Sequence, residues 1–328
     1  MGSRHAKNAS QYTDVAIYDN DPLKTEALSL DLNVTRFSNL SDAWKWSPDG
    51  VIIAIPNYLH VKFAIQSIDN NVKYVLIEKP IADKLDEAQT LVNAANKKGV
   101  SVFVVSNMRF NTAVQTIKKN LFKIGKPLFV TGHVGNYLPN MRPNTDYRKV
   151  YASNKKQGGG VLLDAIHEID YMCWLFGGAK SIFANTDTLS NLEIDVEDFA
   201  SIMIEHDTGV RTTLIMDYLQ QCKRRGCEIV GSEGTLIWSS EGKAPEHCIV
   251  KIFEKSSNQW QLLLEDKSVD LAEPYQKLIR EFVAAIEDKN HSLASIEEGC
   301  DALNVVISSH KSSEIGQRVS LSSRKING

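Results

Sequence analysis

The sequence predicts a two-domain α/β protein whose first half is a doubly wound parallel sheet. The chain has 328 residues, which is long enough for two domains. Apolar residues make up 43% of it, an ordinary share for a protein with a folded core. Short apolar runs alternate with amphipathic stretches up to residue 105, which is the order expected of βαβ units.

The elements of the first half follow from apolar runs and capping residues. Residues 51–55 form a continuous apolar run, typical of a fully buried strand. Asp21 suits an N-cap, Pro22 a first helical turn, and Gly99 the end of a helix. We expect strands over 14–19, 34–37, 51–55, 74–77 and 100–105, and helices opening at Asp21-Pro22 and covering 40–46, 58–68 and 83–98.

The second half begins after Met108, so we expect domains over 1–108 and 109–328. Gly158, Gly159 and Gly160 allow close backbone approach where a helix begins. The last residues, 322–328, are expected to fray. We expect helices over 112–121, from 161 onward, and over 275–286 and 296–309, and strands over 128–137, 199–205, 210–218 and 227–238, the last with a turn at 231–234.

Composition excludes several classes of partner. Lys and Arg number 37 and Asp and Glu 40, and this net charge of −3 argues against nucleic acid or an anionic membrane as the main partner. No apolar run reaches the roughly 18 residues of a membrane span, and the N-terminus has no signal-peptide core. The five cysteines lack disulfide or zinc-finger spacing. We therefore expect reduced thiols, no metal site and a cytoplasmic protein.

A cation is predicted at a sheet edge where ligands bind. The apolar residues 75–77 are followed directly by Glu78, Lys79 and Pro80. The carboxyl ends of parallel strands face a crevice, and a cis bond at Pro80 would fix the direction of Lys79. A solvated lysine before a turn proline explains the same residues.

Asp19 ends the first predicted strand, where an acid accepts hydrogen bonds from an adenosine ribose. Asn20, rather than an arginine, follows it, so no cation is placed for a 2′-phosphate, and NAD is favoured over NADP. A turn over residues 19–22 explains the same aspartate.

Asp164 and His167 stand three residues apart after the glycines, a spacing that places both on one face of a helix. Histidine titrates near neutrality and can take the proton of an alcohol as hydride leaves, with a carboxylate to orient it. Lys79 would then stabilise the developing charge on the oxygen. The alternative is a histidine satisfied within the core.

Three motifs together resemble the glucose–fructose oxidoreductase/inositol dehydrogenase (Gfo/Idh/MocA) family. They are Pro56-Asn57-x-x-His60, Glu78-Lys79-Pro80 and the Gly-rich segment 158–170 (GGGVLLDAIHEID), with 231–236 (GSEGTL) as a further match. The resemblance implies a Rossmann domain followed by an α/β domain with a large, open, mainly antiparallel sheet. It also implies NAD(P)-dependent oxidation of sugars, polyols or nucleotide sugars, and a homodimer or homotetramer formed through the second sheet.

The resemblance further implies roles for particular residues. Many family members have four residues from this aspartate to the histidine, whereas Asp164 and His167 are separated by three. The residues around Tyr147 would contact substrate in this family, and a solvated loop explains the same residues. The implied catalytic residues are Lys79, Asp164 and His167; the cofactor-binding residues are Gly2, Asp19, Pro56, Asn57, His60, Glu78 and Lys79; the substrate-binding residues are Arg109, Tyr147, Arg148, Asp164 and His167.

The N-terminus resembles the tail of a G-x-G-x-M-G-S-R-H turn, with Gly2 as its third glycine. The first strand and the first two glycines are not in this chain. One interpretation places them upstream of an internal Met, and the other is a truncation that weakens cofactor binding. The second leaves open a non-catalytic regulator that binds sugar or cofactor, or a plain scaffold subunit, as alternatives to an NAD-dependent dehydrogenase.

Overall fold

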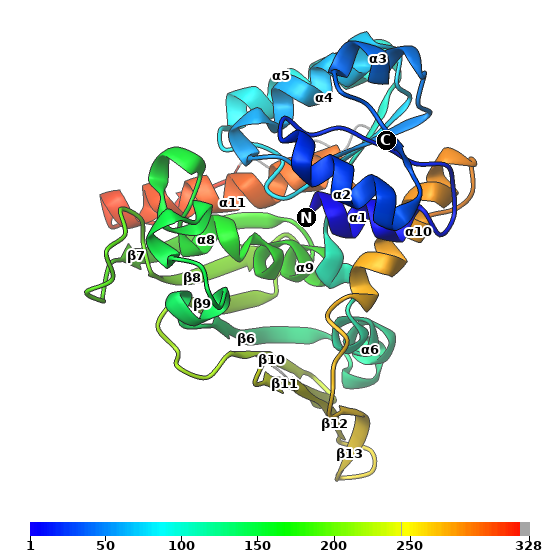
Figure 1. The fold of residues 1–328 in the computed structure, drawn as a ribbon. Helices are drawn as coiled ribbons and strands as arrows, with labels where there is room; N and C mark the ends of the chain where they lie inside the picture. The colour runs from blue at the N-terminus through cyan, green and yellow to red at the C-terminus, as the bar shows by residue number, and fades with distance from the viewer. Residues whose placement is uncertain (244, 322–328) are drawn as a thin grey trace. The chain divides into compact units, whose positions relative to one another are not determined.

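The computed structural model describes residues 1–243 and 245–321, and the chain forms two compact units (Figure 1). The first comprises Met1–Asn107 with Ala272–Cys300, and the second comprises Met108–Leu271 with the remainder. The expected boundary after Met108 lies one residue from the observed one. Residues 272–300, which we expected in the second domain, belong to the first unit because a helix and a strand from this segment pack there. The expected fraying of 322–328 lies outside the described residues.

The first unit has the predicted alternation of strands and helices. Strands β3, β4 and β5 run parallel, and β14 joins β5 in the antiparallel sense to give the order β14-β5-β4-β3. Strands β1 and β2 form a separate parallel pair. The elements are α1 (Gly2–Ala9), β1 (Ala16–Ile17), α2 (Pro22–Leu32), β2 (Thr35–Arg36), α3 (Leu40–Lys45), β3 (Gly50–Ile53), α4 (His60–Asp69), β4 (Tyr74–Ile77), α5 (Leu85–Lys98), β5 (Ser101–Val104), α10 (Glu273–Ile286) and β14 (Ala294–Ser295).

Local signals in this unit are confirmed, with one exception. The Asp21 side chain accepts from the N–H of Leu23 at the start of α2, and Gly99 ends α5 at φ 65°. The prediction of a fully buried strand over 51–55 is wrong. Within the described residues β3 pairs only with β4, so Gly50, Val51 and Ile52 remain partly exposed.

The second unit contains a nine-stranded sheet in the order β13-β12-β11-β10-β6-β9-β8-β7-β15. Neighbouring strands are antiparallel except β6 and β9, which confirms the mainly antiparallel sheet. The strands are β6 (Pro127–Gly135), β7 (Ala179–Asp187), β8 (Phe199–His206), β9 (Arg211–Asp217), β10 (Arg224–Gly231), β11 (Gly234–Glu241), β12 (His247–Glu254), β13 (Gln259–Asp266) and β15 (Val319–Ser320); the helices are α6 (Thr112–Asn120), α7 (Leu138–Met141), α8 (Val161–Asp164), α9 (Ile166–Phe176) and α11 (Ile296–Ile315), the last starting in the first unit.

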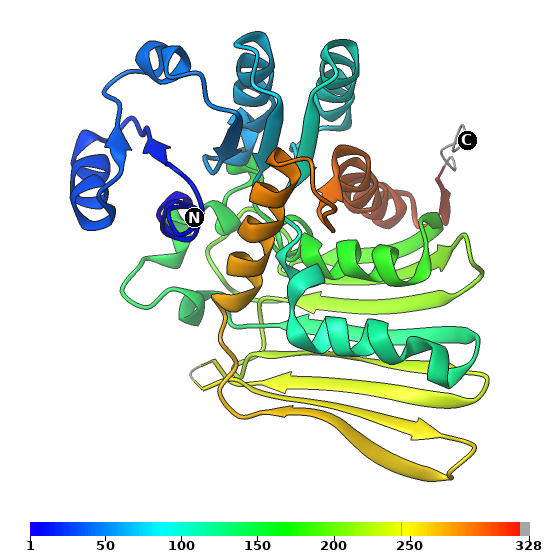
Figure 2. The ribbon, with the colours of Figure 1, turned by 90° about the vertical axis from the view of Figure 1, so that its right-hand side faces the viewer.

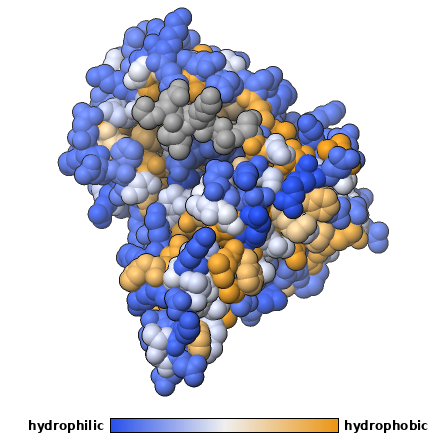
Figure 3. Space-filling model, turned by 180° about the vertical axis from the view of Figure 1, so that it is seen from behind, coloured by the Kyte–Doolittle hydropathy of each residue, from blue (hydrophilic) through white to orange (hydrophobic). Residues whose placement is uncertain are grey.

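Helices cover one face of this sheet and leave the other open (Figure 2). Alternate residues of the strands, such as Ile202 on β8 and Leu214 on β9, are fully buried beneath the helices. The opposite face carries exposed apolar side chains, and Figure 3 shows hydrophobic residues reaching the surface among hydrophilic ones. These side chains are Phe129, Met203, Ile215, Trp260 and Leu262.

Two other expectations have clear outcomes. All five cysteines are free thiols, as predicted. Within the described residues, no helix combines the length and the apolar character that crossing a bilayer requires.

Two buried ion pairs hold α9 within the second unit. The Arg109 guanidinium donates to both carboxylate oxygens of Asp170, at 3.0 and 2.7 Å, with both side chains almost fully buried. The Nε of Arg225 on β10 lies 2.9 Å from the Glu168 carboxylate, which also accepts from the Tyr171 hydroxyl at 2.7 Å. Burial raises the pKa of Glu168, and the Arg225 charge opposes this shift. Both pairs therefore fix the N-terminal half of α9.

Arg109→Met is expected to lower the free energy of unfolding by about 3–5 kcal/mol, because it leaves the Asp170 charge buried without its partner. Adding Asp170→Leu should recover part of this loss. Urea denaturation measures both. Arg224→Met is the matched control, since Arg224 pairs with Glu241 at the surface and should cost at most about 1 kcal/mol. Equal losses for Arg109→Met and Arg224→Met would contradict the assignment.

Candidate functional site

In the first unit, the predicted cofactor residues gather at the carboxyl ends of β3 and β4. Pro56 is exposed and Asn57 is buried in the turn after β3, while Glu78 and Lys79 follow β4 directly. Lys79 is partly exposed, and the Lys79–Pro80 peptide bond is cis. The sheet thus brings Lys79 to the edge predicted from its position after an apolar run.

Glu78 is buried and paired with a histidine that sequence reasoning did not single out as a site residue. The His5 Nε2 atom on α1 lies 2.6 Å from Glu78 Oε1, and the other oxygen accepts from the Lys79 N–H at 3.2 Å. Burial opposes ionisation of Glu78, but the hydrogen bond and charge of His5 outweigh it and lower the pKa of the carboxyl. Glu78 therefore anchors α1 to the end of β4.

His60 serves a different purpose from the expected cofactor contact. Its side chain is 1% exposed, and its ring nitrogens lie 2.8 Å from the Pro80 carbonyl and 2.9 Å from the Ile55 carbonyl. Burial lowers the pKa of His60. The ring joins the loop after β3 to the loop after β4, and its cofactor contact stays a prediction.

The remaining cofactor candidates are exposed. Asp19 follows β1, and its Oδ1 accepts from the Asp21 N–H at 2.9 Å, which confirms the turn interpretation. A carboxylate accepts several hydrogen bonds, so the ribose role stays compatible with this turn. A Cβ built on Gly2 would lie 3.9 Å from the Ala54 Cβ, an ordinary contact, so packing does not require glycine there.

These residues fit a dinucleotide. The first turn of α1 is exposed, and helix N-termini present free N–H groups and a positive dipole end to phosphate. An exposed carboxylate follows β1, and the loops after β3 and β4 flank the same sheet edge. These are the groups that a Rossmann domain offers to ribose, pyrophosphate and nicotinamide.

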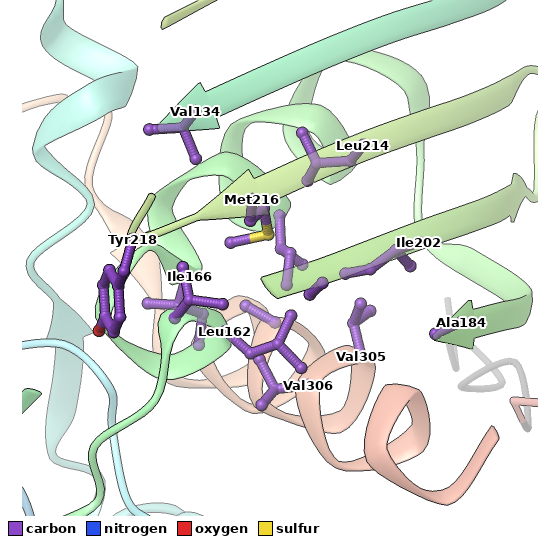
Figure 4. Packing of buried hydrophobic residues seen from close by; sticks show 14 of the residues in the cluster. Val134, Leu162, Ile166, Ala184, Ile202, Leu214, Met216, Tyr218, Val305 and Val306 are labelled. Carbon is purple, nitrogen blue, oxygen red and sulfur yellow. The ribbon is translucent and has the colours of Figure 1, made fainter. Parts of the chain in front are cut away.

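In the second unit, Asp164 and His167 are close in sequence but lie on two helices, not one. Helix α8 ends at Asp164, Ala165 leaves the helical region at φ −98° and ψ 25°, and α9 begins at Ile166. The expectation of a shared helical face is therefore wrong. Leu162 and Ile166 anchor the two helices on the sheet beside Met216 (Figure 4), while Asp164 and His167 remain partly exposed.

Two tyrosines flank Asp164, and sequence reasoning missed both. The Tyr151 hydroxyl donates to Asp164 Oδ1. Burial, and then the neighbouring Asp164 charge, raise the pKa of Tyr218 well above its ordinary value. Both partners are distant along the chain, so local spacing gave no signal for them.

A glycine and an acid shape the start of α8. Gly160 has φ 109°, and a Cβ there would meet the Glu197 carboxylate at 2.4 Å. That carboxylate accepts from the Leu162 N–H at 3.1 Å. Burial raises the pKa of Glu197. The close approach predicted for the glycine segment is thus observed against Glu197.

The residues before the glycine segment that we expected to contact substrate form hydrogen bonds with other residues of the second unit. Arg148 donates to Asp146 and Glu193, which raise its pKa, and its side chain is half exposed. The Tyr147 hydroxyl accepts from the Glu193 N–H at 3.4 Å, and its ring packs on the core. Arg109 is 3% exposed in its pair with Asp170, so it supports α9, and its substrate contact stays a prediction.

Glu78→Gln is expected to lower the free energy of unfolding by about 3 kcal/mol at pH 7, because a buried charge pair loses one partner. The pKa of Glu78 is lower in the folded state than its ordinary value, so its contribution is complete above about pH 5. It is lost as the pH falls below about 4, through the folded value. Urea denaturation at a series of pH values should show the difference from wild type shrinking on acidification.

Glu287→Gln is the control for this comparison. Glu287 belongs to the same unit and pairs with Lys289 at the surface, so its loss should change stability by less than about 1 kcal/mol. A difference for Glu78→Gln that grows on acidification would contradict the pairing with His5.

Two family models match the chain. Residues 1–106 match the oxidoreductase family with an NAD-binding Rossmann fold, and residues 110–237 match the GFO/IDH/MocA C-terminal domain. An uncharacterised oxidoreductase of Synechocystis sp. is 27% identical over 315 residues, which is 87% of this chain and 83% of that protein. The scyllo-inositol 2-dehydrogenase (NAD(+)) of Bacillus subtilis is 26% identical over 72% of this chain and 70% of its own length.

Solved structures share the whole fold. Levoglucosan dehydrogenase, solved with NADH and levoglucosan, has a TM-score of 0.82 at 19% identity, covering 98% of this chain and 97% of that one. The family matches include both the Rossmann domain and the sheet domain that follows it. The chain therefore belongs to the Gfo/Idh/MocA family of NAD(P)-dependent oxidoreductases.

Proposed function

We propose that the protein transfers hydride between NAD and a hydroxyl-bearing carbon of a sugar, polyol or nucleotide sugar in the cytoplasm. The observation that carries the proposal is the placement of the chemical groups in each unit. Lys79 lies at the sheet edge of the NAD-binding domain. Asp164 and His167 lie partly exposed where α8 meets α9 in the second unit.

The first unit would hold the cofactor. The exposed first turn of α1, including Gly2, would face the pyrophosphate, and Asp19 would accept from the adenosine ribose. Asn20 follows Asp19, which favours NAD over NADP because no cation is placed there for a 2′-phosphate. Pro56, Asn57 and Lys79 line the loops beside which a nicotinamide would lie. A bound nicotinamide supplies the acceptor or donor of hydride.

The protein's own groups would handle the proton. An imidazole nitrogen of His167 takes the hydroxyl proton during oxidation and returns it during reduction. The Lys79 ammonium holds the same oxygen and stabilises its developing charge. The Asp164 carboxylate, fixed by Tyr151, accepts from a substrate hydroxyl or orients the imidazole. This scheme requires Lys79 and His167 to reach one substrate, which is part of the proposal.

His167→Ala and Lys79→Ala are each expected to reduce kcat by about 10²–10⁴-fold, the usual contribution of a positioned acid or base. NADH formation with a panel of sugars, polyols and nucleotide sugars measures the loss, and circular dichroism checks the fold. Lys73→Ala and His247→Ala are matched controls, because both side chains are exposed elsewhere. A wild-type rate in His167→Ala or in Lys79→Ala would contradict the role proposed for that residue. NADH binding without turnover by wild type would favour a non-catalytic regulator.

We also propose a homodimer or homotetramer formed through the open face of the large sheet. The apolar side chains Phe129, Met203 and Ile215 lie on three adjacent strands of that face and are 45%, 43% and 41% exposed. Exposed apolar side chains on neighbouring strands are typical of a protein interface. The physical reason is that burial against a second copy removes this surface from water.

Ile215→Lys should shift the protein toward the monomer, because it places a charge at the centre of the proposed interface. Light scattering after size-exclusion chromatography measures the mass across a concentration series. Leu30→Lys is the control, since Leu30 is 79% exposed on α2 of the first unit and should leave the mass unchanged. A wild-type protein that is monomeric throughout the series would contradict the proposal.

A further inference from the structure

Helix α8 is a single turn, and Asp164 is its last residue. The helix covers Val161–Asp164, and the Asp164 N–H closes the turn by donating to the Gly160 carbonyl at 2.9 Å. One turn fixes several backbone angles in exchange for very few hydrogen bonds, so it is not stable by itself. The position of the Asp164 carboxylate therefore depends on groups outside α8 that hold this turn in place.

Glu197, which lies just before β8, holds the start of that turn. Its backbone carbonyl accepts from the Val161 N–H at 3.2 Å, and its carboxylate Oε1 accepts from the Leu162 N–H at 3.1 Å. The first N–H groups of a helix have no partner within the helix, so Glu197 satisfies two of them. The contact joins α8 to a segment that lies 35 residues further along the chain.

Gly160 allows the Glu197 carboxylate to lie directly against the start of α8. A Cβ on Gly160 would lie 2.4 Å from Oε1 and 2.5 Å from Oε2 of Glu197, so any larger residue would displace the carboxylate. His310 on α11 faces the same carboxylate, with its Nε2 4.0 Å from Oε1. The Glu197 side chain is 13% exposed between these neighbours.

The backbone that carries Glu197 is itself fixed by the next residue. Asp198 is fully buried, and its carboxylate accepts from the N–H groups of Leu189 and Ser190 at 2.8 and 3.0 Å. Its own N–H donates to the Asp187 carbonyl at 3.1 Å, at the end of β7. Glu197 therefore extends toward α8 from a rigid support, as a group that orients another must do.

We propose that Glu197 is a positioning residue for the hydride-transfer reaction, because it fixes α8 and through it the Asp164 carboxylate. The Tyr151 hydroxyl holds Asp164 at the other end of the same turn. A displacement of about 1 Å at a reacting group can cost about 100-fold in rate. This inference rests on the proposed function, in which Asp164 accepts from a substrate hydroxyl or orients His167. Glu197 acts through α8 and takes no part in proton transfer.

Two substitutions separate the reach of the Glu197 side chain from its charge. Glu197→Gln keeps an acceptor oxygen at the same distance from the backbone, whereas Glu197→Asp keeps the charge and withdraws the carboxylate by one methylene. We expect Glu197→Asp to lower kcat by about 10–100-fold with a smaller change in KM, because Asp164 is displaced. Glu197→Gln should stay within about threefold of wild type, since the Leu162 N–H keeps its acceptor. NADH formation with the sugars that wild type oxidises measures both.

Hydrogen exchange followed by mass spectrometry tests the same contact without turnover. The amides of residues 160–165 should exchange about tenfold faster in Glu197→Asp than in wild type, because the turn opens more often, and at the wild-type rate in Glu197→Gln. Peptides from β10 and β12 should exchange at the wild-type rate in both variants. Glu265→Asp is the matched control, because Glu265 also pairs with a histidine, His247, at the surface of the same unit. It should alter neither kcat nor exchange over residues 160–165.

The inference is overturned if Glu197→Asp keeps the wild-type kcat, if Glu197→Gln loses as much activity as Glu197→Asp, or if exchange over residues 160–165 does not change. Faster exchange throughout the second unit would also reject it, because Glu197 would then stabilise the whole unit rather than α8. A wild-type kcat in Glu197→Asp would leave the proposed function standing. Faster exchange confined to residues 160–165, in a protein that oxidises no sugar, polyol or nucleotide sugar, would reject the proposed function but sustain the fixing of Asp164 by Glu197.

Discussion

A buried, paired carboxylate stands next in sequence to each residue proposed to handle the substrate hydroxyl. Glu78 precedes Lys79 and is paired with His5, whereas Glu168 follows His167 and is paired with Arg225. A charge removed from water is tolerated only where its partner is held in a fixed geometry. The Glu78–His5 pair therefore constrains the backbone at Lys79 in the first unit, and the Glu168–Arg225 pair constrains the backbone at His167 in the second. Lys79 and His167 extend from rigid backbone even though both side chains are partly exposed.

His60 is a further buried side chain that constrains backbone, here in the loops after β3 and β4. Its imidazole lies between the Ile55 and Pro80 carbonyls and joins the segments that follow β3 and β4. A backbone carbonyl buried without a partner is costly, and the single N–H of a neutral imidazole can satisfy either of these two carbonyls, one at a time. The motif histidine thus holds the two loops of this sheet edge together.

The local sequence pattern predicted the helices and strands. The contacts of their side chains depend on residues far apart in the chain. The apolar run before Glu78, the Asp21 cap and the Gly99 cap depend on neighbouring residues, so they were predictable and are confirmed. Strands β7, β12 and β13 were not predicted. β13 lies at a sheet edge with most of its residues exposed, whereas β7 and β12 carry alternate buried residues that a closer reading of the sequence could have found.

Pairing at long range explains which contacts of the site residues could not be predicted from the sequence. Arg109 and Asp170 are 61 residues apart, and His5 and Glu78 are 73 apart, so no periodicity reveals either pair. Arg109 follows the last strand of the Rossmann domain, a position that suggests a substrate contact. The sequence gives no sign that its guanidinium pairs with Asp170. The break at Ala165 is likewise invisible locally, since the residues around it form good helices.

Tyr151 makes two contacts of different kinds beside Asp164 in the second unit. Its hydroxyl is committed to Asp164, and its ring carries the Arg142 guanidinium. An aromatic ring is attracted to a cation through its face while its hydroxyl hydrogen-bonds at its edge, so one side chain serves both partners without competition. The tyrosine hydroxyl therefore fixes the Asp164 carboxylate, while the ring face receives the Arg142 guanidinium.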